Sequence, residues 1–254
     1  MDIVNALAHV SAIGPYFAIS TDASEQDDPS WRPLGDLHAD TAALRAKITD
    51  YGRRLGTSET RVAASILFQG LAARLWSPMV GAAVAHGLVA VAPATHVHWL
   101  PAATGPLPLW TAGTAAGWAR VDGDAEQAGA VYRAVATELL GPLVAAFHEV
   151  SKAAPAMLWG NAASALAATL RTLPPARPDL APRAARLITE LLALGVLADT
   201  GHPAEPAPGV HFFVRRSCCL YYRVPGGGLC DDCALLPPHE RSAQWERAVQ
   251  FSRE

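Results

Sequence analysis

The stretch ETRVAASILFQGLAARLW, residues 59–76, carries the pattern that decides the fold. Apolar residues recur in it at intervals of three and four, as they do along one face of an α-helix. Thr57 or Ser58 stands where a helix-capping side chain is expected. Other segments are rich in alanine and leucine, which are among the strongest helix formers. We expect helices in these further segments: 2–20, 36–53, 125–150, 156–172 and 180–197.

Two regions differ from this helical pattern. Residues 88–121 and residues 210–224 (VHFFVRRSCCLYYRV) hold β-branched and aromatic residues in short runs, which indicates strands or extended loops. The proline-rich stretches 172–182 and 199–209 are expected to be linkers, because proline interrupts a helix. We therefore predict a mainly α protein (α+β). It has a helical body over 1–208, a small strand-containing insert near 88–121, and a C-terminal cysteine module over 209–254.

The composition restricts the classes of function. The chain has 254 residues, of which 51% are hydrophobic, so it can bury a core without cross-links. Its net charge of −3 and the lack of a basic stripe argue against a nucleic-acid-binding protein. The start of the chain, MDIVNALAHVSAIG, has an acidic residue where an export signal would have basic ones. We expect a cytoplasmic protein, in which cysteines serve more often as ligands or redox groups than in disulfides.

One uncharged segment, residues 76–95, has about the length of a membrane span. It contains two prolines, a histidine and several small residues, so a buried helix followed by its exit loop is the favoured interpretation. We expect no membrane span, although peripheral association with the inner membrane is compatible with the sequence.

All four cysteines lie in RRSCCLYYRVPGGGLCDDCALL, residues 215–236. Cys218 and Cys219 are adjacent, and Cys230 and Cys233 follow after ten residues with two residues between them. A tetrahedral zinc site more often uses two spaced cysteine pairs, which only the second pair provides. A redox dithiol would use only that second pair. A 2Fe-2S cluster has two metal atoms and four thiolate positions, which suits the adjacent pair better.

The glycines between the two cysteine pairs constrain the path of the chain. If PGGG, residues 225–228, were the tip of a regular hairpin, Cys219 would lie about 13 Å from Cys230 along a strand. That separation is too large for a shared cluster. We therefore expect LYYRVPGGGL, residues 220–229, to wrap around the metal as a loop, with Gly226 to Gly228 allowing close backbone approach to sulfur.

Residues 215–236 resemble the C-terminal iron-sulfur module of the FhuF-like ferric siderophore reductases, whose hallmark is this cysteine spacing. Residues 64–78 (ASILFQGLAARLWSP) and 158–166 (LWGNAASAL) extend the resemblance upstream. It implies a cytoplasmic oxidoreductase in which Cys218, Cys219, Cys230 and Cys233 ligate a 2Fe-2S cluster. The cluster would pass one electron to the iron of a ferric siderophore and release it as Fe(II). Without a dinucleotide fingerprint in the sequence, a ferredoxin or flavoprotein is the implied electron donor.

Several other residues are candidates for a substrate site. Three arginines flank the cysteines, and they would stabilise the charge of a reduced cluster, steer an acidic donor, or lie as surface cations beside acidic neighbours: Arg215, Arg216 and Arg223. Asp231 and Asp232 are expected to face solvent or a partner. Trp159 and Asn161, on either side of Gly160, are expected to border a siderophore cleft between body and module, because glycine and asparagine are unfavourable in an alanine-rich helix.

The remaining candidates have simpler interpretations. The other tryptophans could border a cleft, but each is individually expected in the core: Trp76, Trp99, Trp110 and Trp118. His96 and His98 would share one face of a strand, and without an evident third ligand they are expected to be structural. The alternative function is a non-catalytic protein of siderophore binding or biosynthesis that carries a structural zinc site.

Overall fold

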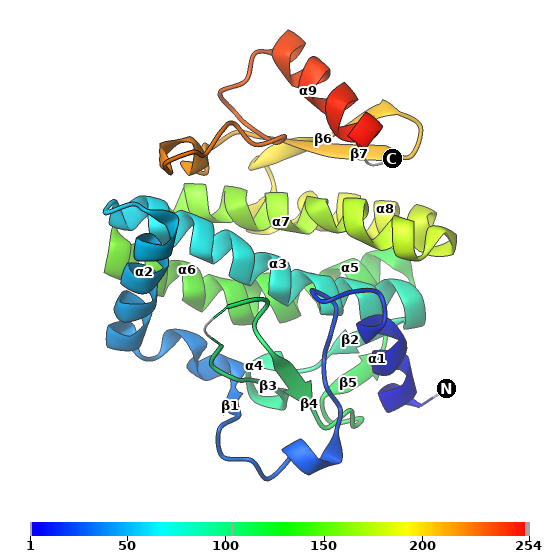
Figure 1. Cartoon of the computed structure of the whole chain (residues 1–254). Helices are drawn as coiled ribbons and strands as arrows, with labels where there is room; N and C mark the ends of the chain where they lie inside the picture. The colour runs from blue at the N-terminus through cyan, green and yellow to red at the C-terminus, as the bar shows by residue number, and fades with distance from the viewer. Residues whose placement is uncertain (1, 103, 252–254) are drawn as a thin grey trace.

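The centre of the fold is one long buried helix. The computed structural model describes residues 2–102 and 104–251, and in it α3 (Thr60–His86) packs along α7 (Pro155–Ala176). Figure 1 shows these two helices side by side across the middle of the molecule. The helix predicted over 59–76 is confirmed and continues to His86. Its predicted cap is wrong: Glu59 is the N-cap residue and makes no side-chain cap, while Thr57 accepts a bond from the Glu59 N–H.

The other predicted helices are present with shifted ends, so the mainly α fold with small sheets is confirmed. The N-terminal helix ends early, because glycine and proline at 14–15 interrupt it. The helix predicted over 125–150 runs from Asp124 to Ser151 and includes a π-helical stretch. These helices are α1 (Ile3–Ser11), α2 (Thr41–Leu55), α5 (Asp124–Tyr132), the π segment (Arg133–Leu140), α6 (Gly141–Ser151) and α8 (Ala181–Leu192).

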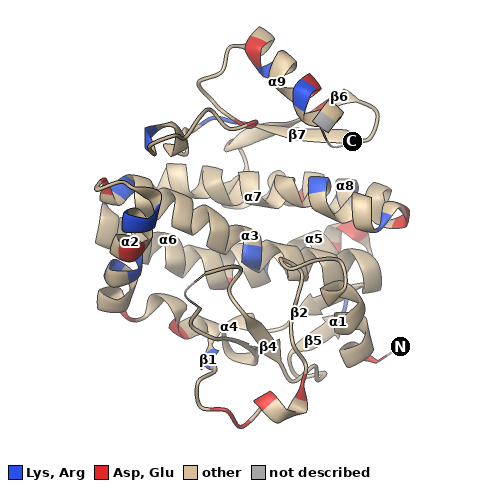
Figure 2. Ribbon diagram, viewed as in Figure 1, with Lys and Arg blue, Asp and Glu red and all other residues tan. Residues whose placement is uncertain are grey.

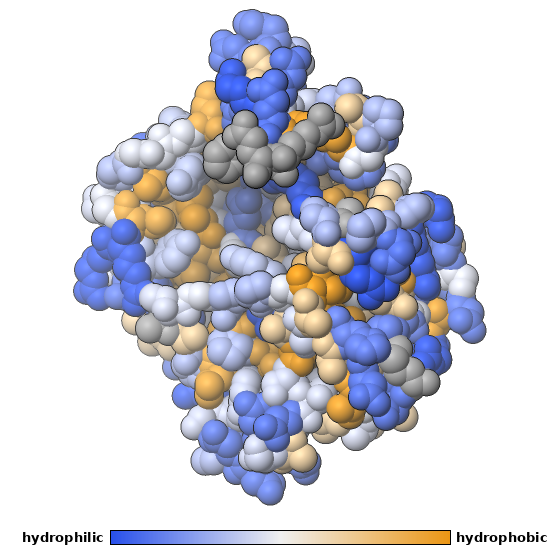
Figure 3. All heavy atoms as spheres, turned by 45° about the vertical axis from the view of Figure 1, so that its right-hand side comes forward, coloured by the Kyte–Doolittle hydropathy of each residue, from blue (hydrophilic) through white to orange (hydrophobic). Residues whose placement is uncertain are grey.

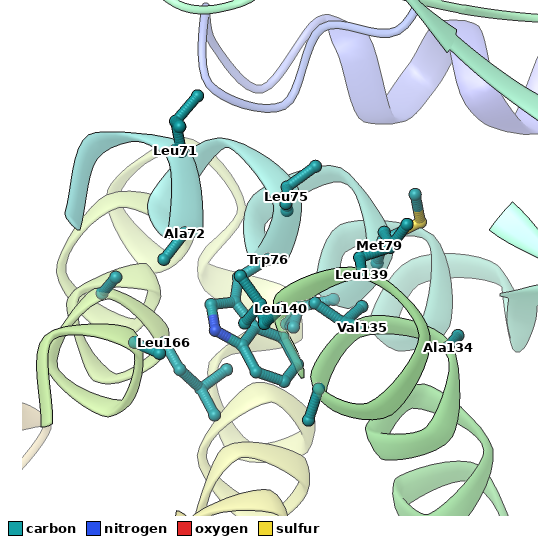
Figure 4. Close-up of a cluster of buried hydrophobic side chains, with 14 of the residues drawn as sticks. Leu71, Ala72, Leu75, Trp76, Met79, Ala134, Val135, Leu139, Leu140 and Leu166 are labelled. Carbon is teal, nitrogen blue, oxygen red and sulfur yellow. The ribbon is translucent and has the colours of Figure 1, made fainter. Parts of the chain in front are cut away.

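The core forms where α3, the π segment and α7 meet. Trp76 is completely buried there, and Figure 4 shows its indole ring between side chains of the π segment and Leu166 of α7. Burying so large an apolar side chain contributes strongly to stability. The prediction that Trp76 lies in the core is therefore confirmed.

The insert expected near 88–121 is confirmed as two small antiparallel sheets. One sheet has the order β1-β3-β4 and the other pairs β2 with β5. Trp99, Trp110 and Trp118 belong to these strands and are buried as predicted. Figure 1 shows the insert below the central helices, on the side opposite the C-terminal module. The elements are β1 (Arg32–Pro33), β2 (Leu88–Ala90), α4 (Pro93–His96), β3 (Val97–Trp99), β4 (Leu109–Thr111) and β5 (Trp118–Arg120).

The two proline-rich stretches are not linkers, which corrects the sequence prediction. At the first, α7 continues to Ala176 and a single 3-10 turn, Pro178–Leu180, leads into α8. Pro182 is accommodated because it lies in the first turn of α8, where its missing N–H has no partner to lose. At the second, Gly201–Ala207 forms β6, whose prolines are tolerated because β6 pairs on one side only.

The C-terminal module consists of the hairpin β6–β7, the cysteine loop and α9 (Pro238–Phe251), with β7 spanning Val210–Arg215. Alternate side chains of β7 point to opposite faces. Phe213 joins the main core, whereas Phe212 and Val214 pack with Trp245 of α9. The boundary expected between 208 and 209 falls within the turn of this hairpin, so a division before β6 would keep the paired strands together.

Among the described residues, one helical run passes a length and composition test for a membrane span. It is Asp124–Ser151, with a mean hydropathy of 1.3, and 56% of the tested window is buried in the fold. A buried core helix passes the same test, so this is weak evidence for a span. The predicted buried helix and exit loop at 76–95 are confirmed as the end of α3, β2 and the start of α4.

Candidate metal centre

The cysteine loop runs from the end of β7 to the start of α9. After Arg215 the chain turns away from the sheet, with Leu220 in the left-handed region at φ 68° and a 3-10 turn at Tyr221–Arg223. Gly226 is also left-handed, at φ 71°, and a Cβ on Gly227 would collide with the carbonyl oxygen of Tyr221. The prediction that this segment wraps as a loop is therefore confirmed.

The wrapping brings the first cysteine pair to the second. The Sγ atoms of Cys219 and Cys230 are 3.8 Å apart. With metal–sulfur bonds of about 2.3 Å and tetrahedral geometry, two thiolates on one metal ion lie roughly 3.8 Å apart. Cys219 and Cys233 are buried, and Cys218 and Cys230 are partly exposed. No set of three His, Cys, Asp or Glu side chains within the described residues is drawn together around one point. The spacing of a shared metal ion is therefore seen for the Cys219–Cys230 pair.

The pKa values of the two paired thiols, Cys219 and Cys230, are shifted in opposite directions. A hydrogen bond from the thiol of Cys230, helped by the nearby positive charge of Arg215 and opposed by burial, lowers the pKa of Cys219 to about 6. The same hydrogen bond, together with burial, raises the pKa of Cys230. Burial also raises the pKa of Cys218. One thiolate therefore forms readily in this loop, which is the state that metals bind.

Arg215 supplies a buried positive charge next to the cysteines. Its side chain is 1% exposed, and its Nη1 donates to Oδ1 of Asn161 at 2.7 Å. The Nε and Nη2 atoms have no hydrogen-bond partner among the described residues, although Nη2 lies 3.9 Å from a carboxylate oxygen of Asp232. A buried guanidinium with unused donors fits an all-thiolate cluster, whose negative charge a fixed cation stabilises.

Asn161 connects this arginine to the helical body. Its Nδ2 donates to the carbonyl oxygen of Ser65 at 3.0 Å and to the Ser65 hydroxyl at 2.8 Å. The same hydroxyl donates to the carbonyl oxygen of Cys219 at 2.7 Å. Asn161 is completely buried, so it and Arg215 are shielded from solvent. This corrects the expectation that these two side chains contact the siderophore directly: they join α3 and α7 to the cysteine loop.

Asp232 is also inside the protein, which corrects the expectation that it faces solvent. It is 6% exposed, accepts a hydrogen bond from Ser164 of α7, and its carbonyl oxygen accepts from the Arg215 N–H at 3.2 Å. Burial raises the pKa of its carboxyl. Asp231 is partly exposed and pairs with Arg171 of α7 at 2.9 Å. The two residues between Cys230 and Cys233 thus both contact α7, Asp231 through Arg171 and Asp232 through Ser164.

The other two flanking arginines lie at the surface. Arg216 pairs with Asp199 at 3.1 Å, and Arg223 pairs with Glu59 at 2.8 Å. Both are well exposed, and such pairs contribute little to stability. For Arg216 and Arg223 the structure therefore agrees with the alternative that they are surface cations beside acidic neighbours. Of the three arginines, Arg215 is the one placed to act on the cysteines from the interior.

Trp159 and Gly160 also lie at the junction with the module. Trp159 is partly buried and packs against the main core. A Cβ on Gly160 would collide with Ser217 Oγ, so glycine at this position permits the cysteine loop to approach α7.

A cleft between the body and the module lies farther along α7. Its volume is about 590 Å³, and it is lined by Leu170, Arg171 and Pro175 of α7, by residues 209–212, and by Asp231, Ala248 and Val249. Figure 3 shows the surface hollowed beneath the C-terminal helix, with apolar and hydrophilic atoms both exposed there. A cleft between body and module therefore exists, but its lining is distant in sequence from the predicted Trp159–Asn161 segment.

The sequence argument missed two partners of the module, Ser65 and Ser164. Asn161 and Ser164 are spaced three residues apart in an alanine-rich helix, so they share one face. A polar face on an otherwise apolar helix indicates that this face of α7 contacts polar groups, which here belong to the C-terminal module. The expectation that His96 and His98 share one face of a strand is wrong, because His96 ends α4 and only His98 lies in β3. The ring of Trp110 lies 5.3 Å from that of His98.

Comparison with known families agrees with the geometry of the loop. The family model of the FhuF 2Fe-2S C-terminal domain matches residues 215–235, which contain all four cysteines. No curated protein matches the chain. The match begins at Arg215 and covers the wrapped loop, including the Cys219–Cys230 contact. Residues 215–235 therefore match the FhuF 2Fe-2S C-terminal domain, which implies a 2Fe-2S cluster in the region that holds the four cysteines.

Proposed function

We propose that this protein is a ferric siderophore reductase, an iron-chelate oxidoreductase that gives one electron to siderophore-bound Fe(III) and thereby releases the metal. The observation that carries the proposal is the four-cysteine loop, which matches the FhuF 2Fe-2S domain and holds Cys219 and Cys230 in contact. A cluster bound there supplies one electron at a time. Siderophore oxygen atoms are hard ligands that suit Fe(III), and reduction to the softer Fe(II) weakens the complex.

The residues around the loop would hold the cluster and adjust its potential. The Leu220 N–H donates to Cys218 Sγ and the Leu235 N–H to Cys233 Sγ, each at 3.4 Å. Backbone donors to sulfur, together with the buried charge of Arg215, favour the more negative reduced state. Cys218 and Cys230 are the partly exposed members of the set. They are the natural exit for an electron toward a bound chelate.

Other components of the reaction follow from the same proposal. Because the sequence has no dinucleotide fingerprint, a ferredoxin or flavoprotein would reduce the cluster in the cytoplasm. The acidic residues near the loop are engaged: Asp231 with Arg171, Asp232 with Ser164, and Glu59 with Arg223. The donor would therefore contact a surface whose charges are largely paired.

Reoxidation of the reduced protein tests this function. The purified protein, which a bound 2Fe-2S cluster would colour red-brown, is reduced with dithionite and freed of excess reductant. It is then mixed without air with a panel of ferric siderophores in the presence of an Fe(II) chelator. We expect the visible spectrum of the oxidised cluster to return while one Fe(II) is trapped per cluster. The matched control is a Cys219→Ser protein, which should carry no cluster and trap no Fe(II).

Two outcomes would contradict the proposal. A colourless wild-type protein that contains zinc would support the alternative, a non-catalytic protein with a structural metal site. A coloured protein that remains reduced in the presence of every chelate would show that the cluster has another electron acceptor.

A further inference from the structure

A basic pocket lies on the side of the body formed by α2 and α3. Its volume is about 290 Å³, and Tyr16 together with residues 102 and 104–107 forms its remaining wall. Three of the described lining residues are basic and none is acidic. The polar and aromatic lining residues are Tyr16, Lys47, Tyr51, Arg54, Arg74 and Thr104. Figure 2 shows basic positions on α2 and α3 below the loop that carries the cysteines.

Arg74 gives the pocket a fixed positive charge that has no acidic partner among the described residues. It is 2% exposed, and its guanidinium donates to three backbone carbonyl oxygens, those of Leu107 at 2.6 Å, Tyr16 at 2.8 Å and Ala18. Burial lowers its pKa to about 10, so it stays charged at neutral pH. These bonds satisfy its donors but leave its charge uncompensated.

Lys47 adds a second uncompensated charge. Within the described residues no carboxylate or hydrogen bond accounts for its ammonium group, while burial and the neighbouring charge of Arg54 lower its pKa. Arg54 is paired with Asp50 at 2.5 Å. Asp50 offsets the charge of Arg54, but the charges of Lys47 and Arg74 in a partly desolvated pocket are unfavourable unless a further anion binds there.

The pocket is close to the cysteine loop. Both of its helices contact that loop: Gly56 at the end of α2 lies against Pro225, and Ser65 of α3 bonds to Cys219. Leu71 of the pocket is six residues after Ser65 in the same helix, a rise of roughly 9 Å. Tyr221 of the loop is near enough to Tyr51 to help raise the pKa of that phenol, after burial and Tyr16.

We propose that this pocket binds an anionic ferric chelate, with a deprotonated catecholate arm held between Lys47 and Arg54 and beside the rings of Tyr16 and Tyr51. This proposal rests on the proposed function and adds the substrate class. Oxygen anions on an aromatic ring suit both the basic groups and the tyrosines. The volume accommodates one arm of a chelate, which leaves the iron near the pocket mouth.

The redox step is balanced with one electron. Fe(III) of the bound chelate becomes Fe(II), and the reduced cluster returns to its oxidised form, having been reduced beforehand by the one-electron donor. No bond to the protein is made or broken.

Binding of a redox-inert chelate tests the pocket separately from the reduction. Ga(III) has the charge and nearly the size of Fe(III), so a trianionic Ga(III) tris-catecholate serves as the probe, with a neutral Ga(III) tris-hydroxamate for comparison. The full holoprotein is titrated with each and tryptophan fluorescence is followed at two salt concentrations. The variants are Lys47→Gln in the pocket and Arg53→Gln as matched control. Arg53 lies on the same helix but is exposed and outside the pocket lining.

We expect the anionic probe to bind at least ten-fold more tightly than the neutral one, with affinity falling as salt rises. Lys47→Gln should weaken it about ten-fold, the loss of one charge-assisted bond, and Arg53→Gln should change it less than two-fold. Equal affinity of Lys47→Gln and wild type, or equal affinity for both probes, would overturn the assignment and favour the cleft beside Asp231. If Ga(III) binding depends on Lys47 but the Fe(III) complex is not reduced, the pocket stands and the proposed reductase function fails.

Discussion

Removing the Asn161 side chain should loosen the cysteine module from the body. Asn161→Ala loses two hydrogen bonds to Ser65 and one to the guanidinium of Arg215. A bond to a charged partner contributes about 1.5–3 kcal/mol and a neutral bond about 0.5–1.5 kcal/mol. The two bonds to Ser65 share one donor group, so we count them as one. The expected loss in the free energy of unfolding is therefore about 2–4.5 kcal/mol.

The substitution should destabilise the cysteine loop before it unfolds the whole protein. In the variant, the buried Arg215 would lose its Asn161 acceptor and keep the carboxylate of Asp232, at 3.9 Å, as a neighbour. Because the affected bonds join the cysteine loop to α3 and α7, the cluster should be released at lower denaturant concentration than the helices unfold. Urea titrations that follow the visible cluster absorption and the far-ultraviolet circular dichroism in the same sample measure both. For a chain of this size the melting temperature should fall by about 10 °C.

A second buried polar residue of α7 provides the matched control. Thr169 is 2% exposed, and its Oγ1 makes no hydrogen bond with any described residue. Thr169→Val keeps the shape and removes an unpaired hydroxyl, so stability should change by less than about 0.5 kcal/mol or rise slightly. If Asn161→Ala costs less than about 1 kcal/mol, or if cluster and helices are lost together as in the wild type, the network does not anchor the module.

Three further predictions concern the cluster, the basic pocket and the body. Serine in place of any one cysteine should abolish or severely deplete the cluster, measured as iron and sulfide per chain, and a Cys218→Ser protein with full content would contradict joint ligation. Lys47→Met should raise the melting temperature at pH 7. The fold lowers the pKa of this lysine from its usual 10.5, by burial and then by Arg54. The charged form therefore carries a penalty below the folded pKa that disappears above about pH 11, and an equal gain at pH 7 and pH 11 would refute this cause. A truncation ending at Thr200 should keep a helical circular dichroism spectrum at reduced stability, because it removes Phe213 from a core that otherwise remains, whereas a random-coil spectrum would refute it.

The sequence by itself determined the elements whose causes are local. Periodic alanine and leucine predicted α3 and the other helices, with errors at ends such as Gly14, where local breakers decided the boundary. The cysteine spacing predicted the wrapped loop, because a hairpin would have separated Cys219 from Cys230. The proline-rich stretches were misassigned, since a proline disrupts a helix interior or a ladder but not the first turn of α8 or the free edge of β6.

The tertiary structure alone decided which polar groups became buried and which segments share a site. Arg215 and Arg216 are adjacent in sequence, yet β7 sends the first to Asn161 in the interior and leaves the second at the surface with Asp199. Likewise Asp232 is buried against Ser164 while its neighbour Asp231 stays at the edge. The basic pocket takes its residues from four separate segments of the chain: Tyr16, α2, α3 and the loop that ends at Leu107. The charge of a side chain is compensated by the groups that lie close to it in space. The distances between such groups depend on the tertiary structure and cannot be read from the order of residues in the sequence.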